Sequence, residues 1–211
     1  NTKLLHGNKM GDANTGATLT PVYQSSAFYQ PSAEQHEKLF HNKATGFSYT
    51  RINNPTIFAF EERMTTLEGG LASVACASGM AAITNALLNI VTCGQEIVAS
   101  TSLYGGSIDV FHDFEAFGIK TVFVDISDVN AVEAAINENT RVIFAETIGN
   151  PKLDVVDIEA LAELAHQHDL PLVMDNTVAT AYLVKPIEKG ADIVVNSTSK
   201  YINGNSNAIS G

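Results

Sequence analysis

Short apolar runs alternate with helix-like segments along most of this chain, which leaves few ways to fold it. The runs are rich in Val, Ile, Phe and Ala, and they lie at Ser73–Ala77, Glu96–Ser100, Lys120–Asp125, Arg141–Glu146, Pro171–Asp175 and Asp192–Asn196. Helical patterns near residues 79–91, 106–117, 129–138 and 157–168 separate them. Continuous apolar strands are typical of a parallel sheet covered on both faces. We therefore expect an α/β fold with a mostly parallel, doubly wound sheet and helices on both faces.

Capping residues support two of these helices. Asp128 and Asp157 stand directly before the third and fourth helical segments, where a carboxylate accepts hydrogen bonds from the first turn. An earlier helical pattern begins at Pro55 and stops at Gly69-Gly70.

Residues 1–55 show no such periodicity. Polar residues, glycine and proline recur throughout this segment and predict turns. A stretch of this length without regular structure is unusual inside a compact domain. We expect an extended N-terminal arm at residues 1–55, which wraps over the rest of the chain or over a second subunit, and a large domain at residues 56–211.

The composition excludes several kinds of partner. The net charge of −11 is wrong for nucleic acid and for anionic lipid, because both require basic patches. No apolar run approaches the roughly 20 residues of a membrane helix, and we expect a cytoplasmic protein. Cys76 and Cys93 lie in apolar segments and are expected to be buried, reduced thiols. The chain has no CxxC pair, so we expect no metal site.

Candidate binding residues follow the strands, at the edge where parallel sheets bind ligands. Gly79 and Met80 open a helix whose first N–H groups favour a phosphate, although small residues at such a turn also serve close packing. Tyr104 precedes two glycines, and its ring either stacks on a flat cofactor or belongs to a covered loop. Asn150 precedes a proline and either donates to a ligand oxygen or shapes the turn.

Two charged residues extend this pattern. Asp175 ends an apolar run and is costly to bury unless it is paired, either with a pyridine nitrogen or with a helix N-terminus. Lys200 follows the last run, after the hydroxyl groups of Ser197 and Ser199. We expect this lysine to form a Schiff base with an aldehyde cofactor rather than to be a solvated surface charge, and the hydroxyls to hold a phosphate.

In combination, these stretches resemble the Cys/Met-metabolism family of pyridoxal 5′-phosphate (PLP) enzymes. The motifs occur in the family's order over nearly the whole chain. They are Tyr49-Thr50-Arg51-Ile52-Asn53-Asn54-Pro55-Thr56, Ser78-Gly79-Met80-Ala81-Ala82, Leu103-Tyr104-Gly105-Gly106, Asn150-Pro151, Asp175-Asn176-Thr177, Gly190-Ala191-Asp192-Ile193-Val194 and Ser199-Lys200-Tyr201. The resemblance implies the large domain of fold-type I PLP-dependent transferases, truncated so that the family's C-terminal domain is absent.

The resemblance also implies roles for single residues. Lys200 matches the lysine that binds PLP and then moves protons on the substrate, and Tyr104 matches the ring that stacks on PLP and assists it. Asp175 matches the partner of the pyridine nitrogen. The other cofactor-binding positions are Gly79, Met80, Asn150, Ser197 and Ser199.

Two further matches lie in the arm. Tyr49 and Arg51 match residues that reach the phosphate of the neighbouring subunit's cofactor. The resemblance therefore implies a homodimer as the catalytic unit, commonly assembled into a homotetramer.

The implied activity belongs to methionine biosynthesis. It is γ-replacement on O-acetylhomoserine by sulfide or a thiol, which gives homocysteine or methionine. Gly105-Gly106 and the Asn196–Lys200 run favour this sulfhydrylase reaction, whereas methionine γ-lyases usually carry cysteine where Gly106 stands. A methionine γ-lyase or a cystathionine γ-synthase or lyase is the alternative, and a non-catalytic protein of the same fold is the second alternative.

Overall fold

The computed structural model describes residues 2–6 and 12–211 of the chain. These residues divide into two compact units, Asn1–Ala75 and Cys76–Gly211, and each unit is described by itself. Among the residues described, no helix has the length and apolar character needed to cross a membrane.

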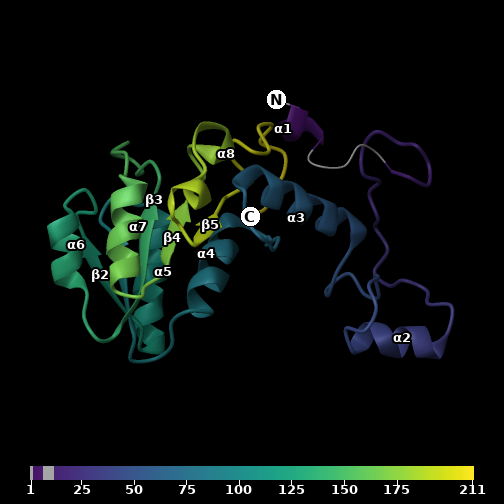
Figure 1. Ribbon diagram of the computed structural model, residues 1–211, viewed down its shortest axis with the longest axis horizontal. Coiled ribbons are helices and arrows are strands. Elements are labelled where there is room, and N and C mark those ends of the chain that lie inside the picture. Colours follow the sequence, from purple (N-terminus) through teal and green to yellow (C-terminus); the bar gives the residue numbers. More distant parts are fainter. Residues whose placement is uncertain (1, 7–11) are drawn as a thin grey trace. The chain divides into compact units, whose positions relative to one another are not determined.

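A five-stranded parallel sheet forms the centre of the second unit (Figure 1). All four strand pairs are parallel, and the order is β2-β1-β3-β4-β5. The strands are β1 (Glu96–Ser100), β2 (Lys120–Val124), β3 (Thr140–Glu146), β4 (Leu172–Asp175) and β5 (Ile193–Val195). The order reverses between β1 and β3, as in a doubly wound sheet, so the expected fold class is confirmed.

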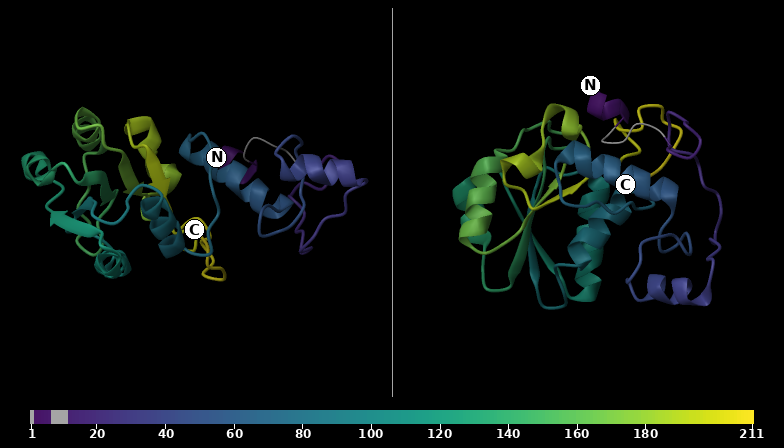
Figure 2. Two further views of the ribbon diagram at one scale, coloured as in Figure 1. Left: turned by 90° about the horizontal axis from the view of Figure 1, so that it is seen from below. Right: turned by 45° about the vertical axis from the view of Figure 1, so that its right-hand side comes forward.

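Helices cover both faces of this sheet (Figure 2, left). One face packs against α4 (Gly79–Leu88) and α5 (Gly105–Phe114), and the other against α6 (Val129–Ala135) and α7 (Ile158–Gln167). Successive side chains of β3 alternate between the two cores: Phe144 joins the α4/α5 core and Ala145 joins the α6/α7 core. Because α5 follows β1 and the first residue of α4, Gly79, lies against Ser197 after β5, both helices begin at the carboxyl edge of the sheet.

The two predicted N-caps are confirmed. Asp128 accepts hydrogen bonds from the backbone N–H groups of Asn130 and Ala131, and Asp157 accepts one from Ala160. The helix predicted near residues 106–117 consists of α5 and the short 3-10 helix η1 (Glu115–Phe117). Two other short helices were not expected from the sequence: α8 (Thr180–Leu183) and η2 (Pro186–Lys189).

The predicted strand at Ser73–Ala77 is wrong. The segment joins no strand ladder, and Cys76 exchanges two backbone hydrogen bonds with Gly211 alone, of 2.8 and 3.0 Å. A strand requires a partner over several residues, which this apolar run does not have in the described part of the chain. The expectation of two buried thiols is also wrong, because Cys93 lies in the turn between α4 and β1 and is exposed; both cysteines are free.

The first unit holds three helices among its described residues. They are α1 (Thr2–His6), α2 (Ala33–Phe40) and α3 (Pro55–Glu68). The helix predicted from Pro55 ends as expected, because Gly69 adopts a left-handed conformation with φ of 79°. The first two helices interrupt the segment expected to be irregular, of which residues 1 and 7–11 lie outside the described part.

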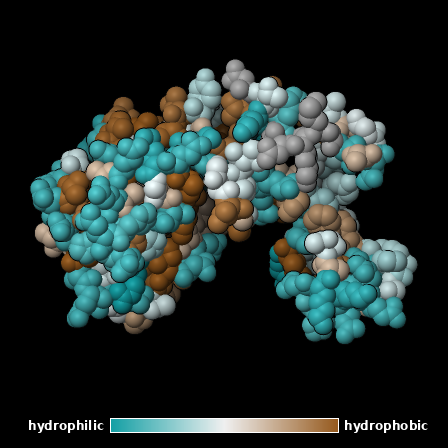
Figure 3. Space-filling model, in the orientation of Figure 1, coloured by the Kyte–Doolittle hydropathy of each residue, from teal (hydrophilic) through white to brown (hydrophobic). Residues whose placement is uncertain are grey.

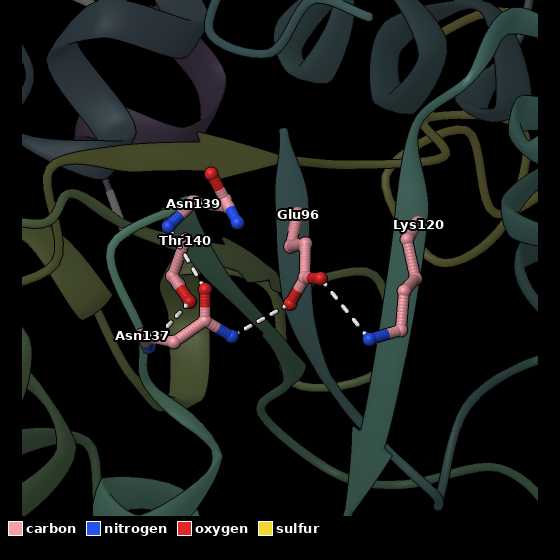
Figure 4. Close-up of polar contacts among 5 residues, drawn as sticks. All are labelled: Glu96, Lys120, Asn137, Asn139 and Thr140. Atoms are coloured by element: carbon pink, nitrogen blue, oxygen red, sulfur yellow. Dashed lines mark hydrogen bonds and ion pairs between the residues drawn. The ribbon is translucent and has the colours of Figure 1, made fainter. Parts of the chain in front are cut away.

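A polar network holds the amino edge of the sheet (Figure 4). The Glu96 carboxylate accepts hydrogen bonds from Lys120 Nζ at 3.0 Å and from Asn137 Nδ2 at 2.8 Å. These bonds, that from Asn137 first, lower the pKa of Glu96. Asn137 also accepts from the backbone N–H of Asn139, and its own N–H donates to Thr140 Oγ1. This edge links the starts of three strands, and the candidate functional groups lie at the opposite edge.

Candidate active site

The carboxyl edge of the sheet brings together the candidate residues of the second unit. Tyr104 follows β1, Asn150 follows β3, Asp175 ends β4, and the Ser197–Lys200 segment follows β5. Asp175 and the Ser197–Lys200 segment can share one edge only if β4 and β5 are neighbours, and they are, with Asp175 in register with Val195.

Gly79 and Ser197 are in close contact at this edge. A Cβ atom at position 79 would lie 2.8 Å from Ser197 Cα and 2.9 Å from its Oγ. Ser78 caps α4 by accepting a hydrogen bond from the Ala81 N–H at 3.1 Å. The N–H groups of Gly79 and Met80 precede that capped position, beside the Ser197 hydroxyl. This arrangement of N–H donors, helix dipole and hydroxyl suits a phosphate group.

Asp175 is buried next to this contact, with 8% of its surface exposed. Its Oδ1 accepts a hydrogen bond of 2.8 Å from the Thr177 N–H, and Thr177 Oγ1 accepts one of 2.7 Å from the Ser197 N–H. Burial raises the pKa of Asp175, and the hydrogen bonds from Thr177 oppose that rise. Among the described residues, Asp175 forms no ion pair with Lys, Arg or His. A cationic group placed here would find an unpaired buried carboxyl.

Glu146 is a second buried carboxyl at this edge, and it was not among the residues predicted from the sequence. It is 6% exposed, stands in register with Asp175, and accepts a hydrogen bond of 2.7 Å from the Tyr104 N–H. Burial, with the nearby Asp175 as a smaller cause, raises its pKa to about 7, and the hydrogen bond from the Tyr104 N–H opposes that rise. An acid at the end of an apolar run was the available signal, because the same signal identified Asp175.

Tyr104 lies at the start of α5 and is half exposed. Its ring lies over Gly106, where an added Cβ would come within 2.6 Å of Tyr104 Cε1. An open aromatic face at the carboxyl edge is suited to stacking on a planar ligand.

Lys200 is exposed on the turn that follows β5. The expectation that it would avoid solvent is not met in the described chain, where Lys200 belongs to the turn at residues 198–203. Its backbone is fixed by hydrogen bonds from the Lys200 N–H to Ser197 O and from the Gly204 N–H to Lys200 O, of 3.1 and 2.9 Å.

The Ser199 hydroxyl already has partners. It donates to Ser210 O at 3.1 Å and accepts from the Ser210 N–H at 2.8 Å. Since its proton is directed to Ser210, this hydroxyl holds the turn before Lys200 in this arrangement. Asn150 is exposed in the turn after β3, before Pro151.

Tyr49 and Arg51 belong to the first unit and are both exposed. The Arg51 guanidinium lies 5.3 Å from the centroid of the Tyr49 ring, a cation–π contact. The structure therefore places these two residues in contact with each other.

Comparison with family models assigns the chain to a family of enzymes. The family model described as "Cys/Met metabolism PLP-dependent enzyme" matches residues 1–211. The chain belongs to this family. As a Cys/Met-metabolism PLP-dependent enzyme, it has pyridoxal 5′-phosphate as its cofactor.

Individual relatives agree with this assignment. An O-acetyl-L-homoserine sulfhydrylase from Leptospira meyeri is 46% identical over 208 residues, which is 98% of this chain and 47% of the relative. An L-methionine gamma-lyase from Fusobacterium nucleatum is 44% identical over 198 residues, which is 93% of this chain and 50% of the relative. The chain thus spans about half the length of these relatives.

Solved structures show the same fold. A protein described as an O-acetylhomoserine (thiol)-lyase from Campylobacter jejuni superposes with a TM-score of 0.93 at 35% identity, over 99% of this chain and 52% of that one. That structure carries a pyridoxyl-lysine phosphate. A cystathionine gamma-lyase from Lactobacillus plantarum, in complex with L-serine, has a TM-score of 0.90 at 40% identity, over 99% of this chain and 52% of that one.

The residues at the carboxyl edge fit PLP. The helix start at Gly79 and the adjoining Ser197 suit its phosphate, and the buried carboxyl of Asp175 suits a protonated pyridine nitrogen. The exposed ring of Tyr104 suits stacking, and Lys200 supplies an amine.

Proposed function

We propose that the protein containing this chain catalyses γ-replacement on an O-acetylated homoserine, with sulfide or a thiol as the second substrate. The observation that carries this proposal is the 46% identity to an O-acetyl-L-homoserine sulfhydrylase across 98% of the chain. The edge formed by Gly79, Asp175 and Ser197 supports it, because it offers groups for both ends of PLP. We place this activity in the cytoplasm.

The bound cofactor would supply an electron sink for charge that develops at the substrate Cα. Lys200 would hold it covalently, and its Nζ, once the substrate's amino group has displaced it, would take the proton from Cα. The carboxylate of Asp175 would keep the pyridine nitrogen protonated through opposite charge in a buried setting. Tyr104 would hold the ring from one face, and Asn150 would meet a cofactor oxygen from the turn after β3.

The phosphate would be held by several small donors. These are the N–H groups of Gly79 and Met80 and the hydroxyl of Ser197, with Ser199 supporting the turn. Each donor is fixed by the backbone rather than by a long flexible side chain, so little conformational entropy is lost when the phosphate binds.

We also propose that a homodimer is the catalytic unit and that dimers pair into a homotetramer. In this arrangement, residues 1–55 form an arm and residues 56–211 form the large domain. Tyr49 and Arg51 of the arm reach the cofactor phosphate of the partner chain. The first unit exposes many large apolar side chains, which supports a role in association: Leu5, Leu19, Val22, Tyr29, Phe40, Ile52, Leu71 and Val74.

A methionine γ-lyase is the second candidate, because one such enzyme is 44% identical over 93% of the chain. Gly106 favours the sulfhydrylase. The Tyr104 ring occupies the space that a side chain at position 106 would need, so the cysteine usual in the lyases would require a different ring position.

A substrate panel tests the proposal. Purified full-length protein, loaded with PLP, is given O-acetylhomoserine with sulfide, O-succinylhomoserine with cysteine, or methionine alone. We expect homocysteine from the first mixture at the highest rate and no product from Lys200→Ala. Rapid methanethiol release from methionine without homocysteine from the first mixture would establish the lyase instead.

A further inference from the structure

We infer that Glu146 is a positioning residue of the cofactor site, which holds the backbone of Tyr104 in place through a carboxyl group that remains protonated beside an ionised Asp175. The inference rests on the proposed role of Tyr104 in stacking on PLP. No step of the proposed reaction uses Glu146.

The sheet register places the two carboxyls side by side. Glu146 and Asp175 are paired residues at the carboxyl ends of neighbouring parallel strands. Phe144 and Val173, two residues earlier in each strand, both belong to the α4/α5 core, so Glu146 and Asp175 continue the same face of the sheet. Both side chains are buried, and two adjacent buried carboxyls resist simultaneous ionisation.

The hydrogen bond from the Tyr104 N–H to Glu146 Oε1 spans the point where the strand order reverses. Tyr104 follows β1 and Glu146 ends β3, and the 2.7 Å bond fixes the start of α5 against β3. The backbone N–H of Asn150 also donates to this carboxyl. Glu146 therefore holds two of the segments proposed to contact the cofactor, one on each side of the crevice.

The charges around Glu146 favour its neutral form. Asp175 on β4 and Asp154 in the loop after β3 are the ionisable groups that face it, with Tyr104 at the start of α5. In the described part of the chain, Glu146 forms no ion pair with Lys, Arg or His. When a cationic pyridine nitrogen keeps Asp175 ionised, the proton of the pair resides on Glu146, and the two carboxyls titrate as a unit. Burial and Asp175 together raise the pKa of Glu146 to about 7, which agrees with a neutral group near pH 6.

Two substitutions separate this role from that of an ionised carboxylate. Glu146→Gln keeps a carbonyl oxygen for the Tyr104 N–H and is neutral, like the protonated acid. Glu146→Ala removes the acceptor and leaves a buried N–H without its partner, which is the costly case. Glu163→Gln on the exposed face of α7 is the matched control, because it makes the same chemical change far from the carboxyl edge.

Two measurements on the full-length protein test the inference. The first is the dissociation constant of PLP at pH 6, obtained by titrating the apoprotein. We expect Glu146→Gln to stay within about threefold of the wild type and Glu146→Ala to bind roughly tenfold more weakly. Equally weak binding by both variants would show that the ionised carboxylate is required. Wild-type binding by Glu146→Ala would show that Glu146 positions nothing.

The second measurement is amide hydrogen exchange at Tyr104 in the apoprotein. Exchange should be about tenfold faster in Glu146→Ala and nearly unchanged in Glu146→Gln. This readout does not involve PLP. If the protein failed to bind PLP, that failure would overturn the proposed function, and the exchange measurement would still test the hydrogen bond from Tyr104 to Glu146. Should Glu146→Ala fail to fold, the Glu146→Gln arm decides, because weakened PLP binding or faster Tyr104 exchange in that variant contradicts the inference.

Discussion

Gly79 lies against Ser197 so closely that any side chain at position 79 would overlap the serine backbone. A Cβ atom there would stand 2.8 Å from Ser197 Cα, so either α4 or the segment after β5 would have to move. Both of these segments belong to the proposed phosphate site. The contact therefore links the packing of α4 to the capacity of the chain to hold its cofactor.

Gly79→Ala should weaken PLP binding and destabilise the apoprotein by about 1–3 kcal/mol, the usual cost of overpacking a rigid contact. Equilibrium dialysis against PLP and urea unfolding measure the two effects. Gly105→Ala is the matched control, since a Cβ at this other helix start meets no atom within 4 Å. Equal PLP affinity and equal stability of the two variants would show that the contact between α4 and Ser197 accommodates a methyl group without loss of stability.

Asp175→Asn should weaken PLP binding by at least tenfold and yet stabilise the apoprotein above pH 5. Burial raises the pKa of Asp175 in the folded state, so the folded state binds more protons than the unfolded state above about pH 4. The stabilisation that protonated Asp175 gives the folded state below its unfolded-state pKa is therefore lost as the pH rises through its folded-state pKa. The free energy of unfolding of the apoprotein, measured with urea, should fall less between pH 5 and pH 8 in Asp175→Asn than in the wild type. An equal loss in both proteins would mean that Asp175 carries no such cost.

Thr177 joins Asp175 to the Ser197 segment, so its hydroxyl group should matter for cofactor binding. Its Oγ1 accepts the Ser197 N–H at 2.7 Å, and its side chain also hydrogen-bonds to Asp175. Thr177→Val should weaken PLP binding by roughly tenfold, because the Ser197 N–H loses its partner and Asp175 keeps only the hydrogen bond from the Thr177 backbone N–H. Thr177→Ser should keep near-normal affinity in the same titration. Wild-type affinity for PLP in Thr177→Val would show that the Thr177 hydroxyl does not contribute to cofactor binding.

Gly106→Ala should displace the Tyr104 ring. The added Cβ would come within 2.6 Å of Tyr104 Cε1, and a half-exposed ring yields more readily than the start of a helix. We expect weaker PLP binding and a lower rate with O-acetylhomoserine and sulfide, with Gly105→Ala close to the wild type. A rate unchanged from the wild type would show that the ring position does not matter for turnover.

The sheet was predictable because its strands are local features. Each of the five strands is a continuous apolar run, and the caps at Asp128 and Asp157 act within one turn of helix. The run at Ser73–Ala77 carries the same local pattern and forms no strand, because strand formation also depends on a partner segment. Periodicity within a run contains no information about that partner.

The site was predictable only in part, for a related reason. Asp175 and Lys200 stand out because each follows an apolar run and carries a charge. Glu146 has the same setting, but its role depends on a hydrogen bond to Tyr104, 42 residues away, and on its register with Asp175. Both depend on the order of strands in the sheet, which no local pattern specifies.

The covalent attachment of PLP to Lys200 is the claim that the rest of the account depends on. Borohydride reduction of the PLP-loaded, full-length protein makes such a link permanent, and peptide mass spectrometry then locates it. We predict a phosphopyridoxyl group on Lys200, with none on Lys185 or Lys189 and none in Lys200→Ala. A group on another lysine, or no stable attachment in a protein that has bound PLP, would contradict the account.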